Sequence, residues 1–177
     1  DSATTTTKGA EAGATLVADS VVQVAAVDAD GGQDLVALGF APGSPNPDAF
    51  GGSPILVVFL NDDSGWIDPA RRIVIPLLDT PLITGLALLQ ADADAAKEVA
   101  LVTEEGALVG DLSLDPGSTP PAGAIVTVRA LPSPSFAAGR AREVACGDFD
   151  GDGVDDLAVA HELAGGVHVY LGKAILP

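Results

Sequence analysis

The sequence is poor in aromatic, basic and sulfur-containing residues, and these shortages exclude several classes of protein. Aromatic residues make up 4% of the 177 positions, methionine is absent, and Cys146 is the single cysteine, so no intrachain disulfide can form. The 8 lysines and arginines face 25 aspartates and glutamates, which gives a net charge of −17. Such a charge argues against nucleic acids and anionic membranes as partners. The longest wholly apolar run, Ile55–Leu60, is too short to cross a bilayer.

Small apolar residues, glycine and proline are abundant. Apolar residues make up 47% of the chain, which also has 21 glycines and 13 prolines. Frequent turns favour many short strands over long helices, and alanine and valine must build most of the core. No basic segment precedes an apolar stretch at the start, so no signal peptide is visible. Because the chain begins with Asp1, we interpret it as a processed protein or a fragment.

One pattern occurs three times: an apolar run, an acidic loop, and an acidic residue that opens a second apolar run. The copies are VAAVDADGGQDLVAL (24–38), LALLQADADAAKEVALV (86–102) and VACGDFDGDGVDDLAVAH (144–161). The opening acids are Asp34, Glu98 and Asp156, which are spaced 64 and 58 residues apart. Residue propensity alone would suggest a helix over Ala91–Val102, but its alignment with the other two copies predicts a strand. An internal repeat of this size indicates a repeated supersecondary unit.

Further apolar runs complete each unit. A third run follows in all three copies (54–60, 106–112 and 165–171), and a fourth follows in the first two (71–78 and 124–131). Four short strands in about 60 residues match one antiparallel propeller blade; a β-sandwich is the alternative fold, and the repeat argues against it. We therefore predict an all-β fold of three four-stranded blades within one propeller region, 1–177. The blades cover residues 21–80, 81–135 and 136–177, after an N-terminal strand or tail over 1–20.

The third blade has three strand candidates inside the chain, which are Arg142–Gly147, Asp156–His161 and Val167–Leu171. Three blades are too few for a ring, since typical propellers have about four to eight. We therefore expect a partial propeller, or one completed by an oligomer. In the favoured arrangement, Thr4–Val17 pairs beside Val167–Leu171 of another copy or of an adjoining blade, in a closed ring or a filament.

The loop over residues 148–156 has the composition of a calcium site. Ca²⁺ takes about six to eight oxygen ligands in a forgiving geometry, and closely spaced carboxylates supply them. Gly151 and Gly153 permit the positive φ angles that a tight loop needs, and Asp155 is expected to point away. The predicted ligands are the carboxylates of Asp148, Asp150, Asp152 and Asp156 and the carbonyl of Val154.

The same loop resembles the FG-GAP/VCBS repeat of integrin α-type β-propellers, which has the pattern D-x-D-x-D-G-x-x-D between the first two strands of a blade. An EF-hand or dockerin loop would need a glutamate at its twelfth position, where this chain has Val159 inside a strand. The resemblance implies an extracellular, calcium-binding structural or adhesion module that assembles with protein partners, with strand donation between copies as one route. It covers about Val21 to Leu171 and is specific only in the third blade.

The other two loops match this pattern less well. The second loop keeps oxygen donors but has alanines in place of the glycines, so a second metal site there is an open alternative. The first loop is two residues shorter, and we interpret it as a vestigial structural turn. The candidate donors are Gln90, Asp92, Asp94 and Glu98 in the second loop, and Asp28, Asp30 and Asp34 in the first.

No signature of catalysis is present, so we predict that the protein is not an enzyme. The chain has no serine nucleophile elbow and no glycine-rich phosphate loop. Two rival functions stay open. One is a carbohydrate-binding propeller, for which Trp66 and Tyr170 are the only Trp and Tyr residues available as platforms. The other is a non-catalytic propeller domain of a secreted enzyme. His161 and His168 flank a hairpin turn, where they could form a transition-metal pair. Exposed histidines are far commoner at such turns, so we expect exposed side chains here.

Overall fold

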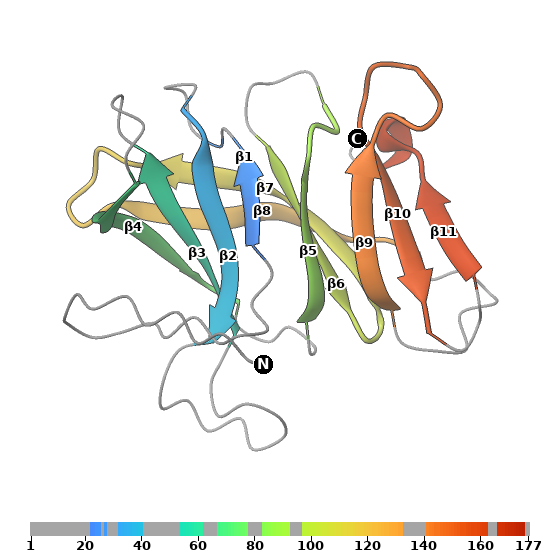
Figure 1. The fold of residues 1–177 in the computed structure, drawn as a ribbon, viewed down its shortest axis with the longest axis horizontal. Helices are drawn as coiled ribbons and strands as arrows, with labels where there is room; N and C mark the ends of the chain where they lie inside the picture. The colour runs from blue at the N-terminus through green and yellow to red at the C-terminus, as the bar shows by residue number, and fades with distance from the viewer. Residues whose placement is uncertain are drawn as a thin grey trace, which may run out of the picture.

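The computed structural model describes residues 22–25, 27, 32–40, 54–61, 67–77, 83–92, 97–132, 141–162 and 166–175. Within these ranges the chain forms eleven β-strands and one 3-10 helix, arranged as three antiparallel sheets that follow one another along the chain (Figure 1). In the described ranges, no helix is both long enough and apolar enough to span a membrane.

The middle strands of the first sheet are apolar at successive positions because both of their faces are buried. Val36 and Ala37, which point to opposite faces of one strand, are each 0% exposed, and so are Leu56 and Val57 on the next strand. The strands lie in chain order, each antiparallel to the one before: β1 (Val22–Ala25), β2 (Asp34–Phe40), β3 (Pro54–Asn61) and β4 (Ile67–Pro76).

The second sheet repeats this order and adds a bulge in its outermost strand. The pairing shifts between Val109 and Asp111, and the bulge places Thr127 at a φ of +52°. The outer strands then reach toward the first sheet (Figure 1), where a Cβ on Gly123 would lie 2.9 Å from a methyl group of Ile73. The strands are β5 (Ile83–Leu89), β6 (Glu98–Thr103), β7 (Gly106–Asp115) and β8 (Ala122–Ala130).

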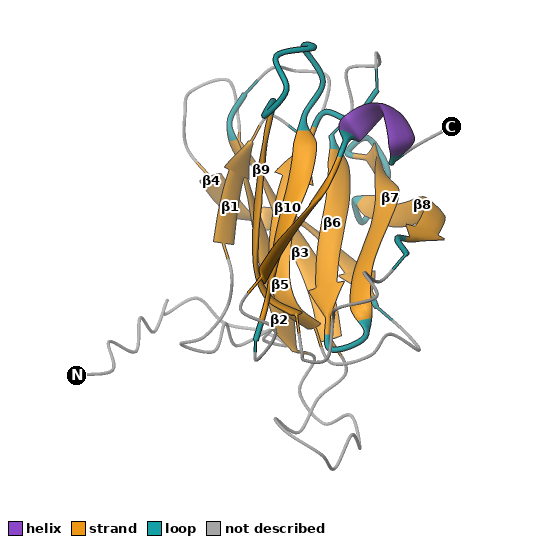
Figure 2. Ribbon diagram, turned by 90° about the vertical axis from the view of Figure 1, so that its right-hand side faces the viewer, coloured by secondary structure: helices purple, strands orange, loops and turns teal. Residues whose placement is uncertain are grey.

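The third sheet has three strands in the described part of the chain, and a short helix follows it. The strands are β9 (Ala141–Gly147), β10 (Asp156–His161) and β11 (Gly166–Tyr170), and the helix is η1 (Gly172–Ala174). The chain leaves the sheet after β11 and turns into η1 beside the β9–β10 loop (Figure 2). Among the described strands, β11 is therefore the outer strand of its sheet, whereas the equivalent strands β3 and β7 each pair with a fourth strand.

The sheets pack face to face, so the first two strands of the second sheet, β5 and β6, are buried on both sides. The first strands lie side by side, β1 against β5 and β5 against β9 (Figure 1). Leu101 belongs to an apolar core shared with the first sheet, whereas its neighbours Ala100 and Val102 belong to a second core shared with the third sheet. This alternation explains why a strand of the second sheet has no polar face.

The structure confirms an all-β chain of antiparallel sheets, including a strand rather than a helix at Glu98–Thr103. The first two sheets have the predicted four strands, and the third has the three strands that the sequence places inside the chain; its fourth strand stays a prediction. After β11, Gly172 is held by a buried carboxylate, and the chain then coils into η1. The segment Thr4–Val17, predicted to pair with another copy, lies outside the described residues.

Candidate metal centre

Asp148 organises the turn that follows β9. Its Oδ1 accepts the backbone N–H groups of Gly151 at 2.7 Å and Asp152 at 3.0 Å, and its Oδ2 accepts that of Gly153 at 2.9 Å. Gly151 and Gly153 have φ angles of +82° and +86°, and no heavy atom lies within 4 Å of a Cβ built on either. The backbone conformation, rather than a lack of space, therefore requires glycine at both positions.

Asp156 follows the loop as the first residue of β10 and is fully buried. Its Oδ2 accepts the N–H of Phe149 at 2.8 Å, and its Oδ1 accepts the N–H of Gly172 at 2.8 Å. One carboxylate thus joins the start of the loop, the start of β10 and the chain after β11. A Cβ on Gly172 would collide with the backbone of Asp155, so this close approach also depends on glycine.

The same contact recurs in the other sheets, at the acids that open their second strands. Asp34 accepts the N–H of Val27 at 3.1 Å and that of Asn61 at 2.8 Å. Glu98 accepts the N–H of Ala91. In all three sheets the acid is seven residues after its first donor. We call Asp34, Glu98 and Asp156 the carboxylate clamps; their shared contact is structural, whatever else they bind.

Three of the five predicted calcium ligands come together. One carboxylate oxygen each from Asp148, Asp150 and Asp156 lies within 4.8 Å of the others, with the first two residues exposed and the third buried. Oxygens that share one Ca²⁺ can be at most about 5 Å apart, twice the usual Ca–O distance of roughly 2.3–2.6 Å. The spacing is therefore that of part of a calcium coordination shell.

Asp152 is not part of this group, because it is occupied by a lysine. Its Oδ2 lies 2.7 Å from Nζ of Lys173, and its Oδ1 accepts the N–H of Val154 at 2.9 Å. The hydrogen bond from Lys173 is the main reason why the pKa of Asp152 is lowered. The pKa of Lys173 is raised, first by its hydrogen bond to Asp152 and then by the charges of Asp152, Asp150 and Asp148. The ammonium group therefore lies where the charges of three loop carboxylates stabilise it.

Asp155 lies outside the group and connects the loop to the second sheet instead. Its backbone N–H donates to the Gln90 carbonyl at 3.0 Å, and its carboxylate accepts the Gln90 N–H at 2.9 Å. Nζ of Lys97 lies 4.0 Å from the same carboxylate. The candidate loop is thus anchored to the neighbouring sheet by a residue that takes no part in the acidic group.

The second and first loops do not form a comparable group within the described residues. In the second loop, the side-chain amide of Gln90 donates to the carbonyl of Asp92 at 3.3 Å, and Glu98 is buried as a clamp. In the first loop, Asp34 is likewise a buried clamp. The remaining predicted donors, Asp94, Asp28 and Asp30, lie outside the described residues, so the alternative of a second metal site stays a prediction.

Sequence reasoning missed the two residues that approach the loop from η1. Gly172 and Lys173 follow the third strand of their sheet, and Asn61 ends the third strand of the first sheet. Gly172 and Asn61 both donate their backbone N–H to the clamp of their own sheet. The repeat could have indicated these backbone donors, but no local pattern indicates the contact of Lys173 with an aspartate 21 residues earlier.

Cys146 lies on β9, the first strand of its sheet, as the sequence predicts. It is half-buried, and its Sγ donates to the carbonyl of Leu88 at 2.9 Å. Burial is the main cause that raises the pKa of this thiol. His161 and His168 share the β10–β11 hairpin but are not directly opposite, because Gly166 pairs with His161 and Val159 pairs with His168. The expectation of exposed histidines is wrong for His161, which is buried.

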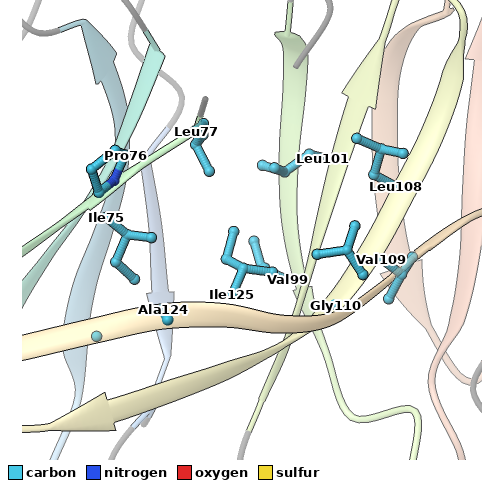
Figure 3. A pocket seen from close by; sticks show the side chains of 12 residues that line it. Ile75, Pro76, Leu77, Val99, Leu101, Leu108, Val109, Gly110, Ala124 and Ile125 are labelled. Atoms are coloured by element: carbon cyan, nitrogen blue, oxygen red, sulfur yellow. The ribbon is translucent and has the colours of Figure 1, made fainter. Parts of the chain in front are cut away.

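A cavity of about 280 Å³ lies between β4 and the outer strands of the second sheet (Figure 3). Every residue lining it is Ile, Leu, Val, Ala, Gly or Pro, including Ile75, Leu101 and Ile125. Such a lining offers no side chain for acid–base or nucleophilic chemistry.

Comparison of the chain with protein-family models, with curated proteins and with solved structures gave no match.

Proposed function

We propose that the protein is a calcium-binding scaffold module without catalytic activity, built of propeller-type blades and working outside the cell. The observation that carries this proposal is the convergence of Asp148, Asp150 and Asp156 oxygens within 4.8 Å in a loop turned by two positive-φ glycines. Carboxylates held this close repel one another, and a bound divalent cation offsets that repulsion.

In this proposal each loop residue has a distinct task. Asp148 and Asp150 present exposed carboxylates, and Asp156 adds an oxygen while it keeps its two backbone hydrogen bonds, because each carboxylate oxygen has two lone pairs. Asp152 joins the site when Lys173 leaves it, and Val154 adds its carbonyl. The bound ion supplies positive charge and rigidity to the loop.

Two further observations support the broader proposal. The clamps repeat at the same place in three sheets that pack in chain order, as expected for blades of the FG-GAP/VCBS type that the third loop resembles. Calcium sites of extracellular modules have dissociation constants of roughly 10⁻⁴–10⁻³ M, and only extracellular calcium reaches such concentrations. A partly exposed loop with a lysine already bound to one acid suits an affinity in that range.

Isothermal titration with CaCl₂ and with MgCl₂ tests the proposal. We expect the wild-type chain to bind calcium with a dissociation constant of about 10⁻⁴–10⁻³ M and magnesium more weakly, since Mg²⁺ needs a stricter octahedral geometry. Asp150→Asn should abolish this binding, because it removes an exposed carboxylate of the group without touching a clamp.

Asp115→Asn is the matched control, since Asp115 is an exposed acid at the end of β7 and far along the chain from the loop. It makes the same change in net charge and should leave calcium binding unaltered. Equal losses in both variants would mean that calcium is attracted by the overall charge of −17 and not by this loop. Undiminished binding by Asp150→Asn would contradict the proposed site.

A further inference from the structure

Polar contacts lie at both ends of the seam between the second and third sheets, where β5 runs beside β9 (Figure 1). At the end where both strands begin, the hydroxyl of Thr84 donates to the carbonyl of Ala141 at 2.8 Å. At the opposite end, Asp155 is hydrogen-bonded to Gln90, the residue that follows β5. Of these two contacts, only the second comes from the candidate metal loop.

The contact between Asp155 and Gln90 is reciprocal. The N–H of Asp155 donates to the Gln90 carbonyl at 3.0 Å, and the N–H of Gln90 donates to the Asp155 carboxylate at 2.9 Å. One loop residue thus satisfies both backbone groups of a residue in the neighbouring sheet. The ammonium of Lys97 lies 4.0 Å from the same carboxylate, and because both side chains are partly exposed this ion pair contributes little.

Asp155 lies between two of the predicted calcium ligands, the carbonyl of Val154 and the carboxylate of Asp156. An ion that joins these two groups to Asp148, at the start of the loop, restricts the backbone on both sides of Asp155. The restricted conformation is the one in which Asp155 reaches Gln90. An ordered loop and a closed contact with the second sheet therefore favour each other.

We propose that Asp155 is a positioning residue of the metal site, which couples calcium binding in the loop to closure of the seam at Gln90. The inference rests on the proposed calcium site and adds a regulated contact to it. Coupling is reciprocal, so if calcium strengthens the contact, the contact strengthens calcium binding by the same factor. The net contribution of a single hydrogen bond corresponds to a factor of roughly 2–10.

Isothermal titration with CaCl₂ tests the coupling in Asp155→Ala and Asp155→Asn. The two variants remove the same charge, but only asparagine keeps a side-chain oxygen that can accept the Gln90 N–H. We expect Asp155→Ala to bind calcium more weakly than Asp155→Asn by a factor of roughly 2–10. A contact that serves the fold alone would leave the two affinities equal. Circular dichroism would verify that both variants fold.

Amide hydrogen exchange followed by NMR, with calcium and with EDTA, tests the closure of the seam itself. Calcium should slow exchange of the Gln90 N–H by a factor of roughly 2–10 in the wild type and in Asp155→Asn, and should leave it unchanged in Asp155→Ala. The N–H of Leu131 is the internal control. It donates to the Ala107 carbonyl at 2.8 Å, at the end of the second sheet away from Gln90, and calcium should leave its exchange unchanged.

The outcomes separate this inference from the proposed function. Calcium that binds the wild-type chain without slowing exchange at Gln90 would overturn the coupling and leave the metal site standing. Equal affinities of the alanine and asparagine variants would do the same, and so would equal slowing at Gln90 and Leu131, which would assign the effect to global stability. A wild-type chain that binds no calcium would overturn both.

Discussion

At the residue scale, buried carboxylates accept hydrogen bonds from backbone N–H groups in the segments that lead into and out of a sheet. Asp34 and Asp156 each hold two backbone N–H groups, one from the loop before their strand and one from the chain that follows the third strand. A buried N–H without an acceptor costs roughly 1–3 kcal/mol. Asp34 and Asp156 therefore each stabilise their sheet by fixing three separate segments at one point.

We predict that Asp156→Ala lowers the free energy of unfolding by about 3 kcal/mol in calcium-free buffer, because one buried and one partly buried N–H group lose their acceptor. Asp150→Ala, which removes an exposed carboxylate, should change it by less than about 0.5 kcal/mol. Urea denaturation of the three proteins measures both effects. Equal small changes would show that Asp156 has no clamping role.

We also predict that Lys173→Gln raises calcium affinity severalfold. The lysine must leave Asp152 before that carboxylate can bind the ion, and glutamine removes this competition. Titration calorimetry measures the change. Lys97→Gln is the matched control, since its ammonium lies near Asp155, outside the acidic group, and the variant changes net charge equally. An identical gain in both variants would assign the effect to overall charge instead.

At the scale of elements, the strands were predictable because each is a continuous apolar run between turn residues. The prediction for β10, Asp156–His161, matches the structure, and those for β9 and β11 differ by one residue at each affected end. β4 begins at Ile67, four residues before the predicted run at Arg71, because a polar and proline-containing stretch still pairs as a strand. Pairing with a neighbour, which local pattern does not encode, decides such ends.

The candidate metal site was predictable only in part, from the spacing of its acidic residues. Sequence spacing placed Asp148, Asp150 and Asp156 in one loop, and the structure brings their oxygens together. It did not indicate that Asp152 would be held by Lys173, which reaches the loop from the far end of the hairpin. Long-range contacts of this kind depend on where β11 ends and not on the loop's own residues.

The bulge in β8 allows a third prediction, at Thr127. A φ of +52° costs an L-residue roughly 1–2 kcal/mol. Glycine adopts this φ without strain, but it destabilises the fold by about 0.5–1 kcal/mol because it loses more conformational entropy on folding. Thr127→Gly should therefore leave stability unchanged or raise it by up to about 1 kcal/mol. Thermal and urea unfolding would measure this.

Val128→Gly is the control for that substitution, because Val128 is the next residue of the same strand and its φ is not positive. Glycine there should lose about 1 kcal/mol, the usual range of strand propensities. A loss at Thr127 as large as the loss at Val128 would contradict the strained bulge.

At the scale of the whole molecule, two apolar cores hold the three sheets together. The first core joins the first and second sheets, and the second joins the second and third. The candidate loop lies at one end of the third sheet, between β9 and β10 (Figure 1). Calcium is therefore expected to stiffen one loop rather than decide whether the chain folds.

The corresponding prediction is quantitative. At a calcium concentration ten times the dissociation constant, one site adds only about 1.4 kcal/mol to the free energy of unfolding. Chemical denaturation in EDTA should thus give a cooperative transition, and calcium should shift its midpoint modestly. Loss of all strand structure by circular dichroism in EDTA would mean that the ion, and not the apolar cores, determines the fold.

A crystal structure determined in millimolar calcium tests the central claim most directly. We predict one ion bound at roughly 2.3–2.6 Å by the carboxylates of Asp148, Asp150, Asp152 and Asp156 and the carbonyl of Val154. Lys173 should have moved away from Asp152, and the hydrogen bond that the Gly172 N–H donates to Asp156 should persist. A loop that holds only water, or that keeps the ammonium of Lys173 on Asp152 in saturating calcium, would contradict the claim.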